Sequence, residues 1–444
     1  MSSTGNSNRS RISYNMNYLS EDEEINDKAL ISSMNALIYK PTESTESTSS
    51  HDETKPTDVR LNDIKQIIYR NGNNKIKPMV SLDEETEDEF NIRVNKQIMD
   101  LQKLSELLNV RLVYAKSGTT GHTFKAISLD NPEKCYAVKV CAYPKDDDHG
   151  AIHNQERPEN AELRILKLFG RFVVGKRTPH FVLPIYSFNT HIIHFINYAK
   201  NLRQDTNKYN TYMKFVRRYQ KGKYDDLVSV LVSEWCNGGD LLDYIRNNYR
   251  TMNRNIWRTI FFQILYTLAR IHEEHPSFRH NDMKVNNILV AKDTLPINGF
   301  KAFRYSLGDY FFVVSNINLN VKIWDFDFAS IDGLIENNKV NAPWTKDINI
   351  SKARNQYYDL HYFFNTLMNF FPEFTKGGAP KEIVDFVYRA VPEQYRVGCA
   401  QSKNNIVKKG RIAVNHEYKT AYKILMEDPL FEKFRYKKSY FNER

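Results

Sequence analysis

The chain has 444 residues, of which 41% are hydrophobic, and a net charge of +10. This length is enough for two or three domain-sized units with a sizeable core. No apolar run of transmembrane length and no secretory signal are found, and the four cysteines form no CxxC pair. We therefore expect a protein of a reducing intracellular compartment, without a membrane span, a zinc site or a disulfide framework.

Charge is distributed unevenly along the chain. Residues 1–100 contain 12 Lys and Arg against 18 Asp and Glu, a net of −6, which leaves +16 for the remainder. Such a basic body predicts acidic, phosphorylated or nucleic-acid partners, although it can also serve solubility alone. Residues 1–90 are rich in Ser, Thr, Asn and acidic side chains. We expect this leader to be largely disordered, with a short helix over 61–70.

Strand patterns come first in the remaining chain, and helical patterns follow Gly238-Gly239. In chain order we expect a helix over 90–108, strands over 110–114 and 134–140, a helix over 159–169, strands over 181–188 and 227–235, and helices over 257–272 and 358–371. This order predicts an α+β fold with a β-rich lobe over 91–240 and a larger helical lobe over 241–444.

The run from His280 to Asn287 carries the strongest chemical signal. Asp282 stands five residues before Asn287 with Lys284 between them, and Asp325 follows 43 residues after Asp282, just behind a strand-like stretch. Phosphoryl transfer needs one carboxylate to orient an attacking hydroxyl, and an Asn and a second Asp to hold Mg²⁺. A coincidental polar loop is the competing interpretation.

A second signal lies upstream. Gly118 and Gly121 could let backbone N–H groups approach phosphate oxygens, although any hairpin can contain such glycines. Lys139 follows Gly121 by 18 residues on an expected strand and, if buried, needs a carboxylate partner. Glu162 on the next helix is well placed for this, with Glu156 and Glu159 as rivals.

These motifs occur in the order found in protein kinases, and the resemblance covers about residues 110–435. The stretches at 278–282, 323–328 and 356–364 resemble more specifically the divergent serine/threonine kinases of large cytoplasmic DNA viruses, of the poxvirus virion-assembly type. The resemblance implies a bilobal kinase-like fold, ATP and Mg²⁺ as cofactors, and protein substrates with Ser or Thr hydroxyls. It also implies a location in the host cytoplasm or the virion.

The resemblance also implies a role for each motif residue. Asp282 would be the catalytic base and Lys284 would stabilise the transferring phosphoryl group, while Asn287 and Asp325 would ligate Mg²⁺. Asp359 would hydrogen-bond backbone amides of the catalytic loop. The expected nucleotide-binding residues are the loop glycines Gly118 and Gly121, the pair Lys139 and Glu162, the hinge residues Glu234 and Cys236, and Asp240 near the ribose.

Four positions depart from the kinase pattern. Lys116 stands where the first loop glycine is expected, and Asn281 replaces the arginine that usually meets an activation-loop phosphate. The second change predicts activity without activation-loop phosphorylation. Asp327 replaces a glycine after Phe326, which disfavours a swung-out inactive state. The usual Ala-Pro-Glu is reduced to Ala-Pro-Trp at 342–344.

Two insertions interrupt the motif order that is usual in protein kinases. Residues 293–320 form one insertion, with a β-hairpin around Gly308-Asp309. The other, near 190–225, has eight Lys and Arg against one acid between Lys200 and Lys223. It predicts contact with an acidic protein or nucleic acid, against the commoner interpretation as one solvated helix face.

Two other function classes are alternatives to a protein kinase. One is a pseudokinase scaffold that binds virion proteins or nucleic acid, and the other is a small-molecule phosphotransferase.

Overall fold

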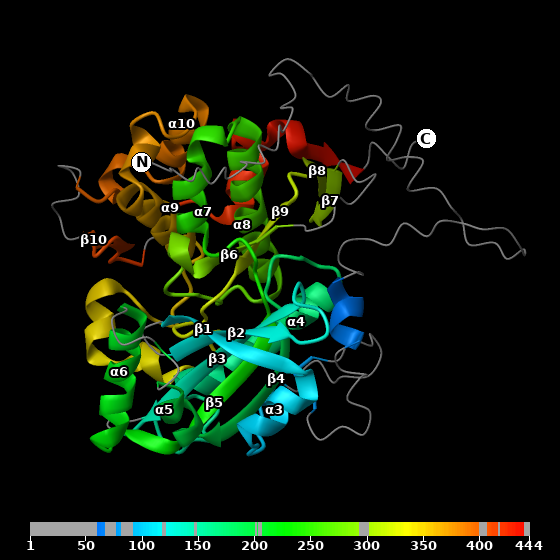
Figure 1. Cartoon of the computed structure of the whole chain (residues 1–444). Helices are drawn as coiled ribbons and strands as arrows, with labels where there is room; N and C mark the ends of the chain where they lie inside the picture. Colours follow the sequence, from blue (N-terminus) through cyan, green and yellow to red (C-terminus); the bar gives the residue numbers. More distant parts are fainter. Residues whose placement is uncertain are drawn as a thin grey trace, which may run out of the picture. The chain divides into compact units, whose positions relative to one another are not determined.

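The computed structural model describes residues 60–66, 77–80, 92–117, 121–145, 149–199, 202, 207–292, 302–398, 406–415 and 418–438. All of these belong to one compact unit, residues 54–444. The expected loop residue Gly118 and most of the leader lie outside the described residues. The described part has a strand-rich N-terminal portion and a mainly helical C-terminal portion, which confirms the predicted α+β class (Figure 1).

A five-stranded antiparallel sheet forms the N-terminal portion, in the order β1-β2-β3-β5-β4. Its strands are β1 Val110–Ser117, β2 Gly121–Ser128, β3 Cys135–Pro144, β4 Pro184–His191 and β5 Tyr224–Glu234. Four of them were predicted. The fifth, β2, was missed although Phe124 and Ala126 are fully buried between half-buried neighbours, which is the period-2 pattern of a strand.

The predicted helix over 90–108 is wrong in its first half. The helix α3 spans only Leu101–Leu108, whereas the described residues 92–100 are not helical. These residues instead hydrogen-bond to β4, an outer strand of the sheet. Met99 N–H donates to the Asn189 carbonyl at 2.8 Å, and Asn189 N–H donates to Gln97 O at 2.8 Å. Pairing with the free edge of β4 satisfies backbone groups that a helix would have satisfied internally.

Helix α4, Pro158–Val174, crosses between β3 and β4 and extends the predicted helix over 159–169 in both directions. Pro158 occupies its first turn, where a missing N–H costs nothing. Helices α5, Ile193–Tyr198, and α6, Asn207–Gln220, belong to the basic insertion. In α6, Tyr212 and Phe215 are buried, and Tyr212 packs edge-on against Tyr114. The charged residues of α6 are exposed. Helix α6 is therefore amphipathic, with Tyr212 and Phe215 facing the core.

The structure describes two stretches of the leader, and the first confirms part of the short helix predicted over 61–70. Residues 60–66 are helical, and Leu61 and Ile64 are buried. Met79 and Val80 are also buried, and Met79 N–H donates to Ile185 O of β4 at 2.9 Å. Leu61 and Ile64 are three residues apart and so lie on one side of the helix, where they can be buried together. The average composition of the leader is polar and does not indicate this local pair.

The C-terminal portion is built around α8, Arg254–Glu274, whose side chains are buried on most sides. Asn253 caps its start by accepting from Ile256 N–H at 3.0 Å. The other α-helices are α7 Leu241–Asn248, α9 Tyr358–Phe370, α10 Lys381–Ala390 and α11 Ala421–Glu427. Short 3-10 helices span Tyr249–Thr251, Val285–Asn287, Asn338–Asn341, Pro343–Ile348, Pro372–Thr375, Glu393–Tyr395 and Pro429–Phe434. No helix in the described ranges is both long and apolar enough to cross a membrane.

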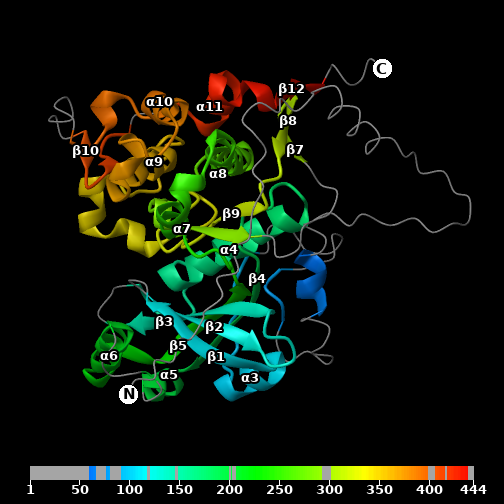
Figure 2. The ribbon, with the colours of Figure 1, turned by 45° about the horizontal axis from the view of Figure 1, so that its top comes forward.

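Three small sheets accompany these helices. The pairs are β6 Ile288–Lys292 with β9 Leu319–Ile323, β10 Val407–Lys408 with β11 Arg411–Ile412, and β7 Ala302–Leu307 with β8 Tyr310–Ser315, which also pairs with β12 Arg435–Lys437. The hairpin predicted around Gly308-Asp309 is confirmed (Figure 2). Phe312 on β8 packs against Phe262 on α8, so the insertion extends the core behind α8.

Candidate active site

The pairing of β6 with β9 brings two predicted site residues together. Ile288 and Ile323 are register partners, so Asn287 before β6 and Asp325 after β9 emerge at the same end of the pair. Trp324 N–H donates to Asn287 O at 3.1 Å and continues the ladder one step beyond the strands. Antiparallel pairing therefore closes a separation of 38 residues between an amide and a carboxylate side chain.

The loop that carries Asp282 is anchored from α9. Asp359 accepts from the backbone N–H groups of His280 at 2.7 Å and Asn281 at 2.9 Å. This confirms the structural task predicted for Asp359. Burial raises the pKa of Asp359, although His280 and Arg279 act in the opposite direction. His280 Nε2 lies 2.9 Å from Trp324 O, so the same loop is also fixed to the segment that holds Asp325.

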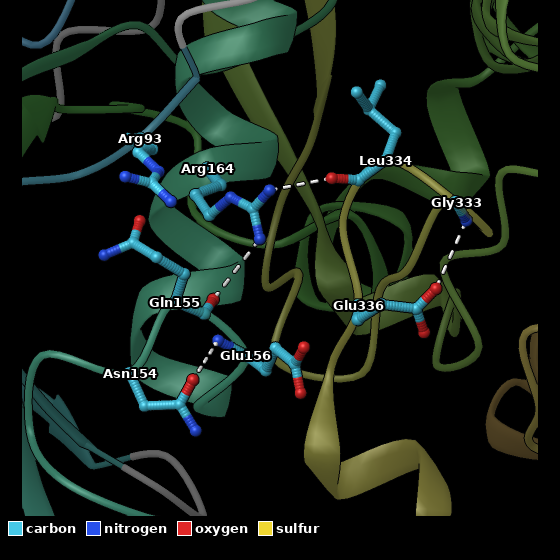
Figure 3. A pocket seen from close by; sticks show the side chains of 8 residues that line it. All are labelled: Arg93, Asn154, Gln155, Glu156, Arg164, Gly333, Leu334 and Glu336. Carbon is cyan, nitrogen blue, oxygen red and sulfur yellow. Dashed lines mark hydrogen bonds between the residues drawn. The ribbon is translucent and has the colours of Figure 1, made fainter.

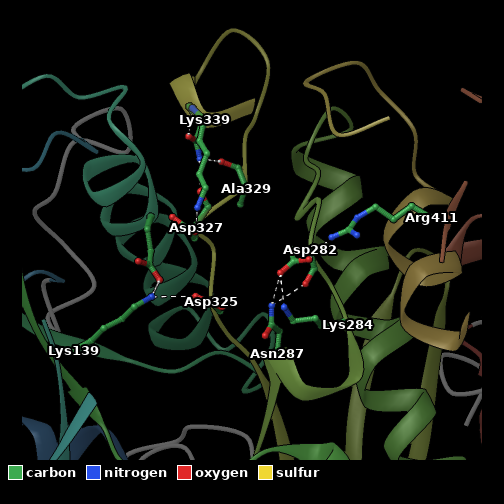
Figure 4. Close-up of polar contacts among 11 residues, drawn as sticks. Lys139, Asp282, Lys284, Asn287, Asp325, Asp327, Ala329, Lys339 and Arg411 are labelled. Atoms are coloured by element: carbon green, nitrogen blue, oxygen red, sulfur yellow. Dashed lines mark hydrogen bonds and ion pairs between the residues drawn. The ribbon is translucent and has the colours of Figure 1, made fainter. Parts of the chain in front are cut away.

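Asp282 is surrounded by donors. Lys284 Nζ lies 3.0 Å from its Oδ2, and Asn287 Nδ2 lies 3.1 Å from the same oxygen and 2.9 Å from the Asp282 carbonyl. Arg411 donates to the other carboxylate oxygen, Oδ1. The sequence analysis named Lys284 and Asn287 as site residues without predicting these contacts, and it missed Arg411 (Figure 4).

Lys139 forms the second half of the site. Its Nζ lies 2.6 Å from Glu162 Oε1 and 3.1 Å from Asp325 Oδ1; the rival Glu159 pairs with Arg157 instead. Burial alone would lower the pKa of Lys139, but the carboxylates of Glu162 and Asp325 outweigh it and raise that pKa well above its usual value. Burial likewise opposes the ionisation of Asp325, yet the Lys139 charge lowers the pKa of this carboxyl. A lysine cation thus lies directly beside the Asp325 carboxylate.

The segment after Asp325 is held in one conformation by several contacts. Phe326 is fully buried and packs edge-on against Phe169 of α4. Asp327 pairs with Lys339. Asn281, which has a left-handed φ of 63°, donates through Nδ2 to Phe328 O and Ser351 O, both at 3.0 Å. Asn281 therefore bridges the two ends of this segment.

The predicted hinge between the two portions is tightly packed. The two hinge glycines hydrogen-bond to β6: Gly238 N–H donates to Val290 O at 2.8 Å, and Val290 N–H donates to Gly239 O at 2.8 Å. A Cβ on Gly238 would lie 2.7 Å from that same carbonyl. Cys236 is buried, which raises the pKa of its thiol to about 12, so we expect an unreactive neutral thiol.

Glu234 is the hinge residue whose side chain the sequence could not place. Its carboxylate accepts from Arg60 Nη2 at 2.6 Å and from Leu183 N–H at 2.7 Å. Burial opposes its ionisation, but the Arg60 charge lowers the pKa of Glu234 overall. Arg60 also donates to Pro179 O at 2.8 Å. The helix over 60–66 thus holds the hinge in place, although 174 residues separate the two partners.

Comparison with known families shows which family the chain belongs to. The family described as poxvirus serine/threonine protein kinase matches residues 151–411, which is more than half of the chain. The chain belongs to this family. It is a protein kinase, and family membership implies ATP as its phosphoryl donor.

Individual relatives agree with this assignment. A protein of Acanthamoeba polyphaga mimivirus with the name "Putative serine/threonine-protein kinase" is 53% identical over 403 residues, which cover 89% of this chain and 84% of the relative. The "Serine/threonine-protein kinase 2" of swinepox virus is 22% identical over 223 residues, which cover 50% of this chain and 42% of the relative. The protein of that name from vaccinia virus strain Western Reserve is 33% identical over 119 residues, 26% of this chain and 24% of the relative.

In this kinase, Lys116 and Asp240 form an ion pair at the expected ribose position. Lys116 Nζ, at the position of the missing loop glycine, lies 2.9 Å from Asp240 Oδ2. Asp240 Oδ1 also caps α7 by accepting from Asp243 N–H at 3.0 Å. Gly121 begins β2 so close to β3 that a Cβ would lie 2.8 Å from Val140 O. This close approach explains why a glycine stands at 121 independently of any phosphate contact.

The donor set of the kinase fits a hard divalent cation bound together with a nucleotide. Asn287 uses its Nδ2 on Asp282, which leaves its Oδ1 for another partner, and the Asp325 side chain is 34% exposed. Mg²⁺ prefers such amide and carboxylate oxygens and takes its remaining ligands from phosphate and water. Among the described residues, no three His, Cys, Asp or Glu side chains gather as a self-sufficient metal site.

A polar cavity of about 390 Å³ lies apart from these residues, between the start of α4 and the segment after Asp327 (Figure 3). Arg93, Arg164, Glu156 and Glu336 are among its lining residues. Arg164 donates to Leu334 O at 2.7 Å, and Asn338 N–H donates to Glu156 O at 2.8 Å. These bonds couple α4, which carries Glu162, to the segment that follows Asp325.

Proposed function

We propose that this kinase transfers the γ-phosphate of ATP to Ser or Thr hydroxyls of proteins, with Asp282 as the base and Asn287 and Asp325 as the Mg²⁺ ligands. One observation carries the proposal: Lys139 contacts both Glu162 and Asp325, while Asn287, at the same end of the β6–β9 pair, contacts Asp282. A lysine cation and a neutral amide thus contact the three carboxylates of the site. A protein that only binds partners needs none of these contacts.

In the proposed reaction, the hydroxyl of the substrate donates its hydrogen bond to the Asp282 carboxylate, which accepts the proton as the new phosphorus–oxygen bond forms. The bond between the γ-phosphorus and its bridging oxygen breaks in the same transfer, and ADP leaves with that oxygen. Lys139 neutralises the phosphates of the nucleotide, and Lys284 stabilises the charge on the transferring group. Mg²⁺ held by Asn287 and Asp325 would neutralise the triphosphate and align it for in-line attack. Positioning and charge neutralisation, rather than covalent work by the protein, supply the acceleration.

We also propose that activity does not require phosphorylation of the activation segment. Five hydroxyls lie between Asp325 and Asp359 in the sequence: Ser330, Thr345, Ser351, Tyr357 and Tyr358. Four of them are at most 1% exposed, and the fifth, Ser351, accepts from Arg279 Nη1 at 2.7 Å. Asn281 and Arg279 both bind the end of the segment directly. The segment therefore offers a modifying enzyme little access and needs no phosphate to be held.

The exposed basic face of α6 supports a coarser proposal about partners. Lys208, Lys214 and Arg217 are exposed on it, and the helix sequence contains no acidic residue. We propose that this face attracts an acidic protein, because the burial of Tyr212 and Phe215 takes two of the helix's four aromatic side chains away from solvent, where they could have stacked on nucleic-acid bases. Binding of labelled single-stranded DNA as tight as that of an acidic protein would contradict this choice.

The proposed reaction is tested by incubating the full chain with γ-labelled ATP, Mg²⁺ and carrier proteins of acidic and of basic composition. The matched variant is Asp282→Asn, which keeps the shape and most hydrogen bonds of the side chain but cannot accept the proton. We expect label on Ser or Thr of the carrier with wild type and a loss of at least about a hundredfold with the variant. Equal transfer by both proteins would refute the proposed function, and no transfer by either would favour a scaffold.

A further inference from the structure

The catalytic-loop carboxylate has a partner that the kinase reaction does not require. Lys284 and Asn287 both donate to Asp282 Oδ2, whereas Arg411 of β11 donates to Oδ1. The Arg411 and Asp282 side chains are only 10% and 11% exposed. The guanidinium carbon also lies 3.9 Å from the centroid of the Tyr362 ring. A cation therefore covers the oxygen that remains for the hydroxyl of a substrate.

The hairpin β10–β11 presents this arginine from a fixed position. Its two-residue turn, Lys409-Gly410, has positive φ angles of 50° and 81°, as a tight hairpin turn requires. Ile412 is fully buried, and its carbonyl accepts from Asn349 Nδ2 at 3.2 Å. The hairpin is thus attached to the activation segment on one side and, through Tyr362, to α9 on the other. This position next to the base is where a substrate segment has to lie.

The charge of the hairpin has one sign. Between Glu393 and Glu417 the sequence contains five Lys and Arg and no Asp or Glu. Lys409 is exposed at the turn, Lys408 precedes it and is half-buried, and Arg411 is buried against Asp282. A single exposed charge attracts an oppositely charged group only weakly. Several cations close together produce a stronger positive potential, which attracts a negatively charged segment of a substrate.

We propose that the hairpin β10–β11 recognises protein substrates with Asp or Glu side chains next to the target Ser or Thr, and that Arg411 is the residue that couples this recognition to the base. In the absence of substrate, Arg411 pairs with Asp282. A carboxylate of the substrate offers the guanidinium a second partner, which releases Oδ1 for the substrate hydroxyl. This inference rests on the proposed function and adds the class of substrate to it.

The test compares the full-length kinase on peptides that share one Ser and differ only in the three residues on one side of it. These residues are Asp, Asn or Lys, placed before the Ser in one series and after it in the other. We expect kcat/KM in one of the two series to be roughly tenfold higher for Asp than for Asn, which corresponds to about 1.4 kcal/mol. Raising the ionic strength should reduce the preference, since salt screens exposed charges.

Three hairpin variants and one control then locate the preference. In Lys408→Ala/Lys409→Ala and in Arg411→Gln, the ratio of Asp to Asn peptides should fall to within roughly threefold, and Arg411→Lys should restore part of it. The loss in the double variant should lie in KM for the Asp peptide, whereas Arg411→Gln should also raise kcat for the Asn peptide because the base is no longer covered. The control Lys423→Ala/Lys433→Ala removes two exposed charges from the α11 region and should keep the wild-type ratio.

The outcomes separate this inference from the proposed function. An active wild type that treats Asp, Asn and Lys peptides alike, or a preference that survives in all three hairpin variants, overturns the recognition role. If Arg411 were only a structural support, Arg411→Gln would lower activity on all peptides by the same factor. If Asp282→Asn were as active as wild type on every peptide, the proposed function itself would fail.

Discussion

Replacing Asn281 isolates the contacts that hold the activation segment. Its Nδ2 donates to Phe328 O and Ser351 O at 3.0 Å, and its Oδ1 accepts from Ser351 N–H at 3.3 Å. All three bonds disappear in Asn281→Ala, and at roughly 1 kcal/mol each they amount to about 3 kcal/mol. The left-handed φ of 63° adds roughly 1 kcal/mol of strain for alanine, so the free energy of unfolding should fall by about 4 kcal/mol.

The structure offers a matched control for this substitution. Asn318 has nearly the same φ, 52°, but its side chain is exposed on the β8–β9 connection. Asn318→Ala should therefore cost only the strain of roughly 1 kcal/mol, and Asn281→Gly should recover that strain while still losing the bonds. Urea unfolding measures all three variants.

Activity provides the second readout for Asn281. Loosening the segment should lower peptide phosphorylation by at least about tenfold, while the affinity for Mg-ATP, set mainly by Lys139 and Asp325, should change by less than about threefold. The reasoning is refuted if Asn281→Ala and Asn318→Ala are equally stable, or if Asn281→Ala phosphorylates peptides at the wild-type rate.

Three further predictions follow from the same structure. Wild-type kinase freed of phosphate by a phosphatase should retain at least about half of its peptide activity, since no phosphate holds the segment; loss of activity, with mass spectrometry locating the removed phosphate between Asp325 and Asp359, would contradict this. Gly238→Ala should lower the free energy of unfolding by at least about 2 kcal/mol, because its Cβ would lie 2.7 Å from Val290 O; an unchanged urea midpoint would show that the hinge relaxes freely. Burial lowers the pKa of His122, His272 and His361 to about 4 each. Only the unfolded chain therefore binds these three protons between pH 6.5 and 4, and stability should fall as pH falls through this window by about 1.4 kcal/mol per pH unit for each histidine. Burial also lowers the pKa of His180, which adds to the total slope, so His122→Gln should reduce the slope by about 1.4 kcal/mol per pH unit; an identical slope in this variant would exclude the histidine as a cause.

Most of the candidate site could be predicted because its residues stand beside strands and helices that the sequence pattern indicates. Asn287 and Asp325 each flank a strand, and two adjacent antiparallel strands place such flanking residues at one end. Glu162 could be chosen over Glu159 only as the better-placed candidate, and the structure shows it 2.6 Å from Lys139. The role of Asp359 was predicted from the resemblance to protein kinases, and the structure shows its carboxylate accepting from His280 and Asn281 N–H.

Other contacts could not be predicted because they depend on distant segments. Arg411 and Asp282 are 129 residues apart, and the strands that present Arg411 are only two residues long, which is too short for any periodic signal. Arg60 stands in a leader whose average composition is that of a disordered chain, although two buried apolar residues are enough to dock seven residues. Residues 92–100 have acceptable helical composition, but the free edge of β4 competes for their backbone groups.

The central claim is that Lys139, Asn287 and Asp325 hold one magnesium-bound nucleotide beside Asp282. Calorimetric titration of ATP with and without Mg²⁺ tests it directly, with Asp325→Asn as the variant, because asparagine tolerates the left-handed φ of 65° at this position. We predict one ATP bound per chain, with an affinity that Mg²⁺ strengthens in wild type by at least about tenfold and in Asp325→Asn by much less. An ATP affinity that is indifferent to Mg²⁺ in wild type, or a Mg²⁺ effect that persists unchanged in the variant, would contradict the claim.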